Sequence, residues 1–231
     1  MVNKRLKREE INLLNKKEKL DYFMNLNDDV KIATGNTKLG NCICALSFPA
    51  GVTCRKDAPC RKECYCMKGN QITSSVLGTY MKNYRIWQED SKKFFKQIDG
   101  FLKSHGYKYM RIFDSGDIPS TEFLIDLTKK VVNKNKRIKF LMYTKQYEIV
   151  NSVFNEEFPK PKNFTIVFST WDKAWGTEKI EGNYPKSYID FKDKERNVKI
   201  TQKHIECSGN CSKCLKCWKL KDNECVVFHQ H

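Results

Sequence analysis

The chain has 231 residues, of which 40% are hydrophobic and 30% charged, a composition typical of a soluble globular protein with one large or two small domains. No apolar run reaches the ~20 residues of a membrane-spanning helix, and no apolar core follows the charged N-terminal residues, so we expect a cytoplasmic protein without a membrane partner. Lys and Arg number 43 against 27 Asp and Glu, and the formal charge of +16 favours nucleic acid or nucleotide partners, although an AT-rich genome would also enrich a chain in Lys and Asn.

The first part of the chain is predicted to be helical on either side of an irregular, Cys-containing region. Apolar side chains at helical spacing predict three helices, at residues 4–24, 73–87 and 91–105. Gly106 ends the third of them in the usual position for a C-terminal stop. Residues 30–34 alternate as in a strand, and the Gly and Pro residues that follow predict irregular structure to about residue 70.

From residue 109 onward, strands alternate with helices. Strands are predicted at residues 109–113, 139–143, 164–168 and 197–201. Helices are predicted at residues 120–132, with Ser120 as N-cap, and 148–155. The polar stretch 173–196 predicts a long loop. Strands that alternate with helices imply right-handed βαβ units, so we expect an α/β protein with a mainly parallel sheet.

The 11 cysteines are confined to two groups, within residues 42–66 and 207–225. A secreted disulfide scaffold would be shorter and would spread its cysteines along the chain. Reduced thiols that bind a metal ion or an iron–sulfur cluster are therefore the favoured interpretation, with disulfides or simple packing as the alternative.

The first group offers three thiols within a short loop, Cys54, Cys60 and Cys64, and a set with Cys66 in place of Cys54 is the alternative. Neighbouring basic residues would favour thiolates and offset the charge of a thiolate-bound centre; these are Arg55, Lys56, Arg61 and Lys62. No histidine is nearby, which weakens a zinc-finger interpretation.

The second group contains four cysteines in 11 residues, Cys207, Cys211, Cys214 and Cys217. Read backwards, their spacing is that of bacterial ferredoxin cysteines, whereas structural zinc usually takes two pairs separated by a longer loop. An iron–sulfur cluster is therefore favoured over zinc, which stays the alternative. The remaining cysteines are spare, buried or substitute ligands: Cys42, Cys44, Cys66 and Cys225.

Polar residues follow three of the predicted strands, at residues 114–117, 144–145 and 169–172. Parallel α/β sheets collect their ligands at the carboxyl ends of the strands. Helix capping is the ordinary explanation for such residues. Ser120 already provides a cap, however, so Asp114 and Asp117 are predicted to have a functional role.

Over roughly residues 50–175 these features resemble the radical S-adenosylmethionine (radical SAM) superfamily. Its cysteine loop is commonly C-x3-C-x2-C, and here Cys54, Cys60 and Cys64 take that place with five and three intervening residues, which departs from the pattern. Three further elements of the superfamily have counterparts here. Its Gly-Gly-Glu-Pro-like turn is similar to Ser115-Gly116-Asp117-Ile118-Pro119, its Thr-Asn-Gly-like element to Tyr143-Thr144-Lys145, and its Ser-Leu-Asp-like element to Ser169-Thr170-Trp171-Asp172.

A closer resemblance is to the small, phage-encoded gene-product-88-like family of short radical-SAM-type proteins. The matching stretches are residues 36–40, 49–54, 114–117 and 143–145 and the C-terminal cysteine run. The resemblance implies a partial (β/α) barrel of radical-SAM type at residues 30–201. A helical extension at residues 1–29 would precede it, and a Cys-rich cluster-binding segment at residues 202–231 would follow. A phage protein would work in the cytoplasm of the host cell.

The resemblance also implies an activity. Cys54, Cys60 and Cys64 would hold a [4Fe–4S] cluster with one open iron, which binds S-adenosylmethionine for reductive cleavage with an electron donor. Asp117 would accept from the methionine ammonium group, and Gly116 would permit close approach. Ser115, Thr144 and Ser169 would complete the cofactor site, and the C-terminal cysteines would hold an auxiliary cluster.

The substrate of such an enzyme is not indicated beyond nucleic acid or nucleotide as candidates. One alternative is a non-catalytic nucleic-acid-binding protein, stabilised by iron–sulfur or zinc, in which Trp171, Trp175 and Trp218 stack on bases. On the competing interpretation, Trp171 and Trp175 only cover the core. A third hypothesis is a barrel that keeps a cluster without using S-adenosylmethionine.

Overall fold

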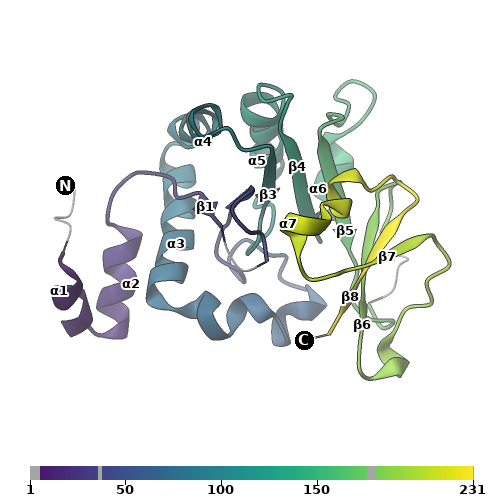
Figure 1. Cartoon of the computed structure of the whole chain (residues 1–231), viewed down its shortest axis with the longest axis horizontal. Helices are drawn as coiled ribbons and strands as arrows, with labels where there is room; N and C mark the ends of the chain where they lie inside the picture. Colours follow the sequence, from purple (N-terminus) through teal and green to yellow (C-terminus); the bar gives the residue numbers. More distant parts are fainter. Residues whose placement is uncertain (1–5, 36–37, 176–179, 231) are drawn as a thin grey trace.

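The computed structural model describes residues 6–35, 38–175 and 180–230, and its centre is a single mixed sheet (Figure 1). The strands are β1 (Ala33–Thr34), β2 (Ile43–Leu46), β3 (Tyr109–Ile112), β4 (Lys139–Thr144), β5 (Phe164–Ser169), β6 (Lys186–Asp190), β7 (His204–Glu206) and β8 (Cys225–His229). Across these described residues the sheet has eight strands in the order β1-β2-β3-β4-β5-β6-β8-β7. Every neighbouring pair is parallel except β1 with β2.

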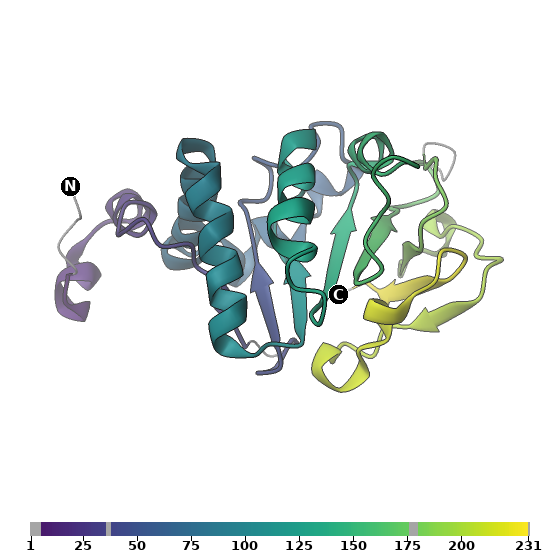
Figure 2. The same cartoon turned by 90° about the horizontal axis from the view of Figure 1, so that it is seen from above.

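Helices that follow the strands in sequence cover one face of the sheet. They are α3 (Ser74–Glu89), α4 (Ser91–His105), α5 (Thr121–Leu127), which continues as a π-helical turn at Thr128–Val132, and α6 (Tyr147–Val153). Figure 2 shows α4 and α5 lying along the strands. Local sequence fixes the ends of α4, because the Asp90 side chain accepts from the backbone N–H of Lys93 and Gly106 ends the helix with φ +67°.

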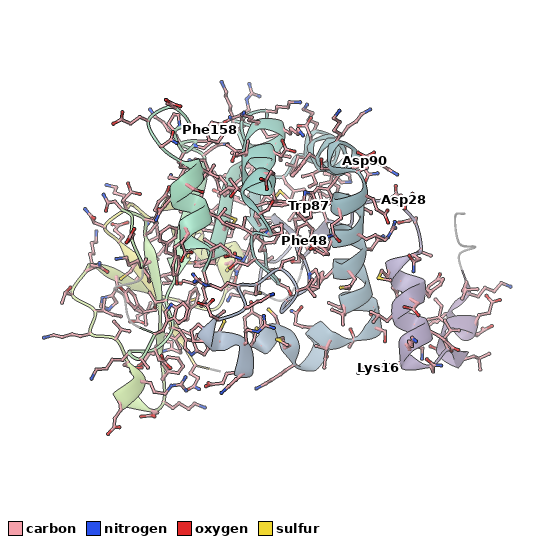
Figure 3. All side chains as sticks on the ribbon, turned by 180° about the vertical axis from the view of Figure 1, so that it is seen from behind. Lys16, Asp28, Phe48, Trp87, Asp90 and Phe158 are labelled. Atoms are coloured by element: carbon pink, nitrogen blue, oxygen red, sulfur yellow. The ribbon has the colours of Figure 1, made fainter. Side chains whose placement is uncertain are left out.

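Phe48, two residues beyond β2, lies at the centre of the core on this helical face. Its side chain is fully buried among five aromatic rings, with centroids 5.3–5.9 Å away: Tyr84, Trp87, Phe94, Phe113 and Phe123. Figure 3 labels Phe48 and Trp87 side by side in this cluster. The chain that leaves β2 is therefore anchored in the core before it enters the cysteine loop.

The opposite face of the sheet is covered by the C-terminal cysteine segment. Ile43, Leu141 and Val167 point to this face and pack with Trp218, Leu215 and neighbouring residues of that segment. In the same segment, α7 (Cys211–Cys214) lies in front of the sheet in Figure 1. The two last strands, β7 and β8, join the sheet beside β6.

The predicted α/β class and mainly parallel sheet are confirmed. The sheet is not shown to close, because the edge strands β1 and β7 are not paired in the part of the chain that the structure describes. No helix in that part is long and apolar enough to cross a bilayer.

Several predicted boundaries are wrong. The helix expected at residues 4–24 is two short helices, α1 (Arg8–Leu13) and α2 (Lys16–Met24), because Asn15 caps α2 by accepting from the backbone N–H of Glu18; residues 4 and 5 lie outside the described residues. The strand expected at residues 30–34 shrinks to β1. No strand forms at residues 197–201, and β6 lies instead within the predicted loop at 173–196.

Candidate functional site

The loop after β2, which carries Cys54, Cys60, Cys64 and Cys66 of the first cysteine group, lies over the carboxyl ends of β3 and β4. The backbone N–H of Phe48 donates to Ser115 O (3.1 Å), and that of Asp117 donates to Thr53 Oγ1 (3.0 Å). Further along the loop, the Tyr65 hydroxyl donates to the carbonyl of Asp114 (3.0 Å). The loop is thus fastened to the 114–117 turn at both of its ends.

Gly116 is required at the point where these two segments meet. It has φ +82°, and a Cβ atom there would lie 2.7 Å from both Phe48 O and Thr53 Oγ1. The close approach that glycine permits is therefore between two segments of the chain itself.

A Gly116→Ala variant is expected to lose about 2–4 kcal/mol of unfolding free energy in urea, from the left-handed backbone and the backbone clash together. Gly106→Ala is the matched control, because Gly106 has φ +67° but no atom within 4 Å of the added Cβ. Equal losses in the two variants would show that the contact with Phe48 and Thr53 is unimportant.

Cys54, Cys60 and Cys64 are all partly buried and lie near one another. Burial raises the pKa of Cys54 to about 11 and also raises that of Cys60. Cys60 and Cys64 further raise the pKa of Cys54, and Cys64 raises the pKa of Cys60. The pKa of Cys64 is lowered, because its sulfur accepts from the Cys66 thiol and from the backbone N–H groups of Cys66 and Met67. These hydrogen bonds favour the thiolate form of Cys64.

Asp117 is buried, with 6% of its surface exposed, and its carboxylate joins two strand ends. Oδ1 accepts from the Thr144 hydroxyl (2.6 Å) and the Ile118 N–H (2.8 Å), and Oδ2 accepts from the Lys145 N–H (2.9 Å). Burial raises the pKa of this carboxyl, and the hydrogen bonds oppose that shift. The structure thus brings Gly116, Asp117 and Thr144 together, as the sequence predicts.

The other two predicted cofactor residues differ in their surroundings. Ser115 is 2% exposed, and its Oγ finds no hydrogen-bond partner in the described residues. Ser169 lies one strand farther along, at the end of β5. Its hydroxyl contacts Ser187 Oγ (3.4 Å), and its carbonyl accepts from the Tyr147 hydroxyl.

Two cations that border the first cysteine group were both indicated by the sequence, Arg55 by its place between the cysteines and Lys145 by its position just past a strand end. The charge of Lys145 lowers the pKa values of Cys60 and Cys64, and its ammonium lies 5.7 Å from the centre of the Trp171 ring. Arg55 pairs with Glu148 (3.1 Å) and lies over the Trp175 ring.

The second group, Cys207, Cys211, Cys214 and Cys217, lines one small pocket on the opposite face of the sheet. Burial raises the pKa values of Cys211 and Cys217. Lys38 and Arg111 oppose this shift at Cys211, and a hydrogen bond from the Tyr143 hydroxyl opposes it at Cys217. All four predicted ligands are therefore gathered at one place.

A model of the gene product 88 family matches residues 23–220. The chain belongs to the gene product 88 family. The matched residues include both predicted ligand sets and strands β1 to β7 of the sheet, and the predicted family membership is confirmed. No curated protein and no solved structure matches the chain. The relation of the gene product 88 family to radical SAM proteins stays a prediction.

In this gene product 88 family member, the two cysteine groups are neighbours across β3 and β4, although 140 residues without a cysteine separate them in sequence. Arg111 is 8% exposed, with Nε 3.7 Å from Asp114 Oδ1 and its guanidinium 4.9 Å from the centre of the Tyr143 ring. Tyr143 contacts Cys217, and Tyr65 contacts both Asp114 and Cys66. A continuous series of contacts therefore joins the groups, in which the Tyr65 hydroxyl meets the backbone carbonyl of Asp114.

Within the described ranges, no group of three or more His, Cys, Asp or Glu side chains converges as around a single metal ion. Cysteines that hold an iron–sulfur cluster bind different irons, so their sulfurs are not expected to converge on one point.

The prediction that Trp218 stacks on a base is wrong. Its side chain is only 3% exposed and its Nε1–H donates to Met110 O (3.4 Å), so its ring is not available to a base.

Proposed function

We propose that the chain is an iron–sulfur protein of radical-SAM type that reductively cleaves S-adenosylmethionine to act on a further substrate. The observation that supports this most is the position of Cys54, Cys60 and Cys64 over the carboxyl ends of β3 and β4, against the 115–117 turn. A partial (β/α) barrel of radical-SAM type is part of the same proposal.

The first group has donors and charges that suit a [4Fe–4S] cluster. Backbone N–H groups donate to the sulfurs of Cys54 and Cys64, and Lys145 supplies a positive charge beside Cys60. Hydrogen bonds and charge near the sulfurs are the means by which proteins stabilise and tune such clusters. The buried, unpartnered hydroxyl of Ser115 would gain a partner from a polar group of a bound cofactor.

When bound, the cluster and S-adenosylmethionine would supply one-electron cleavage of a carbon–sulfur bond, with electrons from a low-potential donor. The residues of this chain would bind, orient and exclude water. A carboxylate has about four acceptor positions, and Asp117 uses three of them within the protein. The remaining position, on Oδ2, would accept from the methionine ammonium group while the internal hydrogen bonds fix the carboxylate.

The second group would hold an auxiliary cluster that serves as an electron conduit or substrate anchor. The contacts from Cys66 through Tyr65, Asp114, Arg111 and Tyr143 to Cys217 support this role, because they form an unbroken path between the two groups. Zinc at this second site is the alternative.

The test uses protein purified and reconstituted anaerobically with iron and sulfide, then mixed with S-adenosylmethionine and dithionite. Chromatography is expected to detect 5′-deoxyadenosine and methionine from the unchanged protein and from Cys42→Ala, whose thiol is exposed. Cys54→Ala, Cys60→Ala and Cys64→Ala are each expected to abolish the product. No product from cluster-loaded protein, or zinc as the only bound metal, would contradict the proposal.

A second candidate function is nucleic-acid binding without catalysis. The formal charge of +16 favours it independently of the cysteines. Trp171 and Trp175 give it little support, since both rings already lie against the cations of Lys145 and Arg55.

A further inference from the structure

A basic pocket lies at the amino ends of β4 and β5, at the opposite edge of the sheet from the Cys54–Cys64 loop. It has a volume of about 240 Å³, enough for about eight waters. Four lysines line it: Lys139 at the start of β4, Lys160 and Lys162 before β5, and Lys219 from the C-terminal segment. Residues from three parts of the sequence thus form one cationic hollow.

Most of this charge is not neutralised by the protein. Asp222 is the acidic residue among those that line the pocket. Burial lowers the pKa of Lys160, and the negative charge of Asp222 opposes this shift. The Lys160 ammonium also donates to Phe164 O (3.1 Å). Lys139, Lys162 and Lys219 are exposed, and none of the three forms an ion pair within the described residues. Unpaired ammonium groups around a hollow attract an anion with several oxygens.

The pocket suits a phosphate group better than a base. The Trp218 ring at its wall is 3% exposed, so it offers no face for stacking. The turn that leads into β4 adds three more exposed cations, Lys134, Lys136 and Arg137. Cations beyond the pocket suit an extended polyanion, because a nucleic-acid strand presents phosphates at regular intervals.

We propose that the pocket formed by Lys139, Lys160, Lys162 and Lys219 binds the phosphate backbone of a nucleic-acid strand. Binding there would be largely independent of base sequence, because phosphate contacts position a strand without reading it. This pocket would be the binding site for the second candidate function, nucleic-acid binding, and it would act independently of the cluster chemistry. Its experiment contains neither reductant nor S-adenosylmethionine, so the two proposals fail separately.

The experiment titrates fluorescent oligothymidylates of 2, 6 and 12 nucleotides with anaerobically reconstituted protein at several salt concentrations. The test variant is Lys139→Gln/Lys162→Gln/Lys219→Gln. The control, Lys16→Gln/Lys92→Gln/Lys96→Gln, removes the same charge from α2 and α4; Figure 3 labels Lys16 at the far end of the molecule from the C-terminal segment. Equal urea midpoints of the two variants establish that both are folded.

We expect the test variant to bind the 12-mer about tenfold more weakly at low salt. The negative slope of log affinity against log salt is expected to become shallower by about 2, because three phosphate contacts are lost. The control is expected to stay close to the unchanged protein, and affinity is expected to rise with strand length. Equal weakening by both variants would overturn the proposal, and so would the absence of saturable binding. Pyrophosphate is titrated in the same way. If it binds as tightly as the 12-mer and is weakened equally by the test variant, the pocket binds a small phosphate compound and the proposal of a nucleic-acid strand is wrong.

Discussion

A Cys211→Ala/Cys214→Ala variant, reconstituted anaerobically with iron and sulfide, is expected to retain about half of the iron held by the unchanged protein. Cys211 and Cys214 line one pocket with Cys207 and Cys217, so their removal leaves too few thiolates there for a cluster. Cys54, Cys60 and Cys64 lie on a different loop, over the carboxyl ends of the strands, and are expected to keep their cluster.

Iron and acid-labile sulfide, measured per chain, check this expectation. Cys42→Ala is the control, because Cys42 is exposed and lies outside the pocket. Loss of all iron from the double variant would mean that the two groups do not form independent centres. Unchanged iron content would mean that the C-terminal cysteines hold zinc or no metal.

A Phe48→Ala variant is expected to lose about 3–5 kcal/mol of unfolding free energy, the usual cost of removing a fully buried ring. The Phe48 ring has no exposed surface and contacts five aromatic neighbours, so the remaining rings cannot close the cavity without disturbing α3, α4 and α5 together. Urea unfolding measures the loss.

Val52→Ala is the control for Phe48→Ala, since Val52 lies in the same loop but is 53% exposed; its expected change is within about 0.5 kcal/mol. The position of Phe48 also has a consequence for the site. Its backbone N–H donates to Ser115 O, so a loosened ring would loosen the cysteine loop from the 115–117 turn. A loss no larger than that of Val52→Ala would contradict the anchoring role.

Elements with strong local signals were predicted from the sequence. Residues 91–105 form α4 with the predicted bounds, because one apolar stripe and a terminal glycine agree. The strands β3, β4 and β5 and the parallel arrangement also follow from the alternation of strand and helix. The grouping of the cysteines, and the polar residues past the strand ends, identified the candidate site before any geometry was known.

What the sequence could not predict depends on contacts between distant segments. β2 is buried on both faces and β8 on most of its length, so neither shows the alternation that marks a half-buried strand. Trp218 lies in a polar, Lys-rich stretch, yet the sheet buries it.

The sequence by itself determined the fold class, the family and the two sets of thiols, since these depend on residue types and on short-range spacing. Tertiary structure alone decided that the C-terminal cysteine segment covers the face of the sheet opposite the helices. It likewise decided that position 116 must be glycine, because the Phe48 carbonyl approaches it closely. It also decided that Lys139, Lys162 and Lys219 share one pocket. The physical reason is the same in each case: burial and charge at these positions are set by the segment packed against them, and the local sequence does not specify that segment.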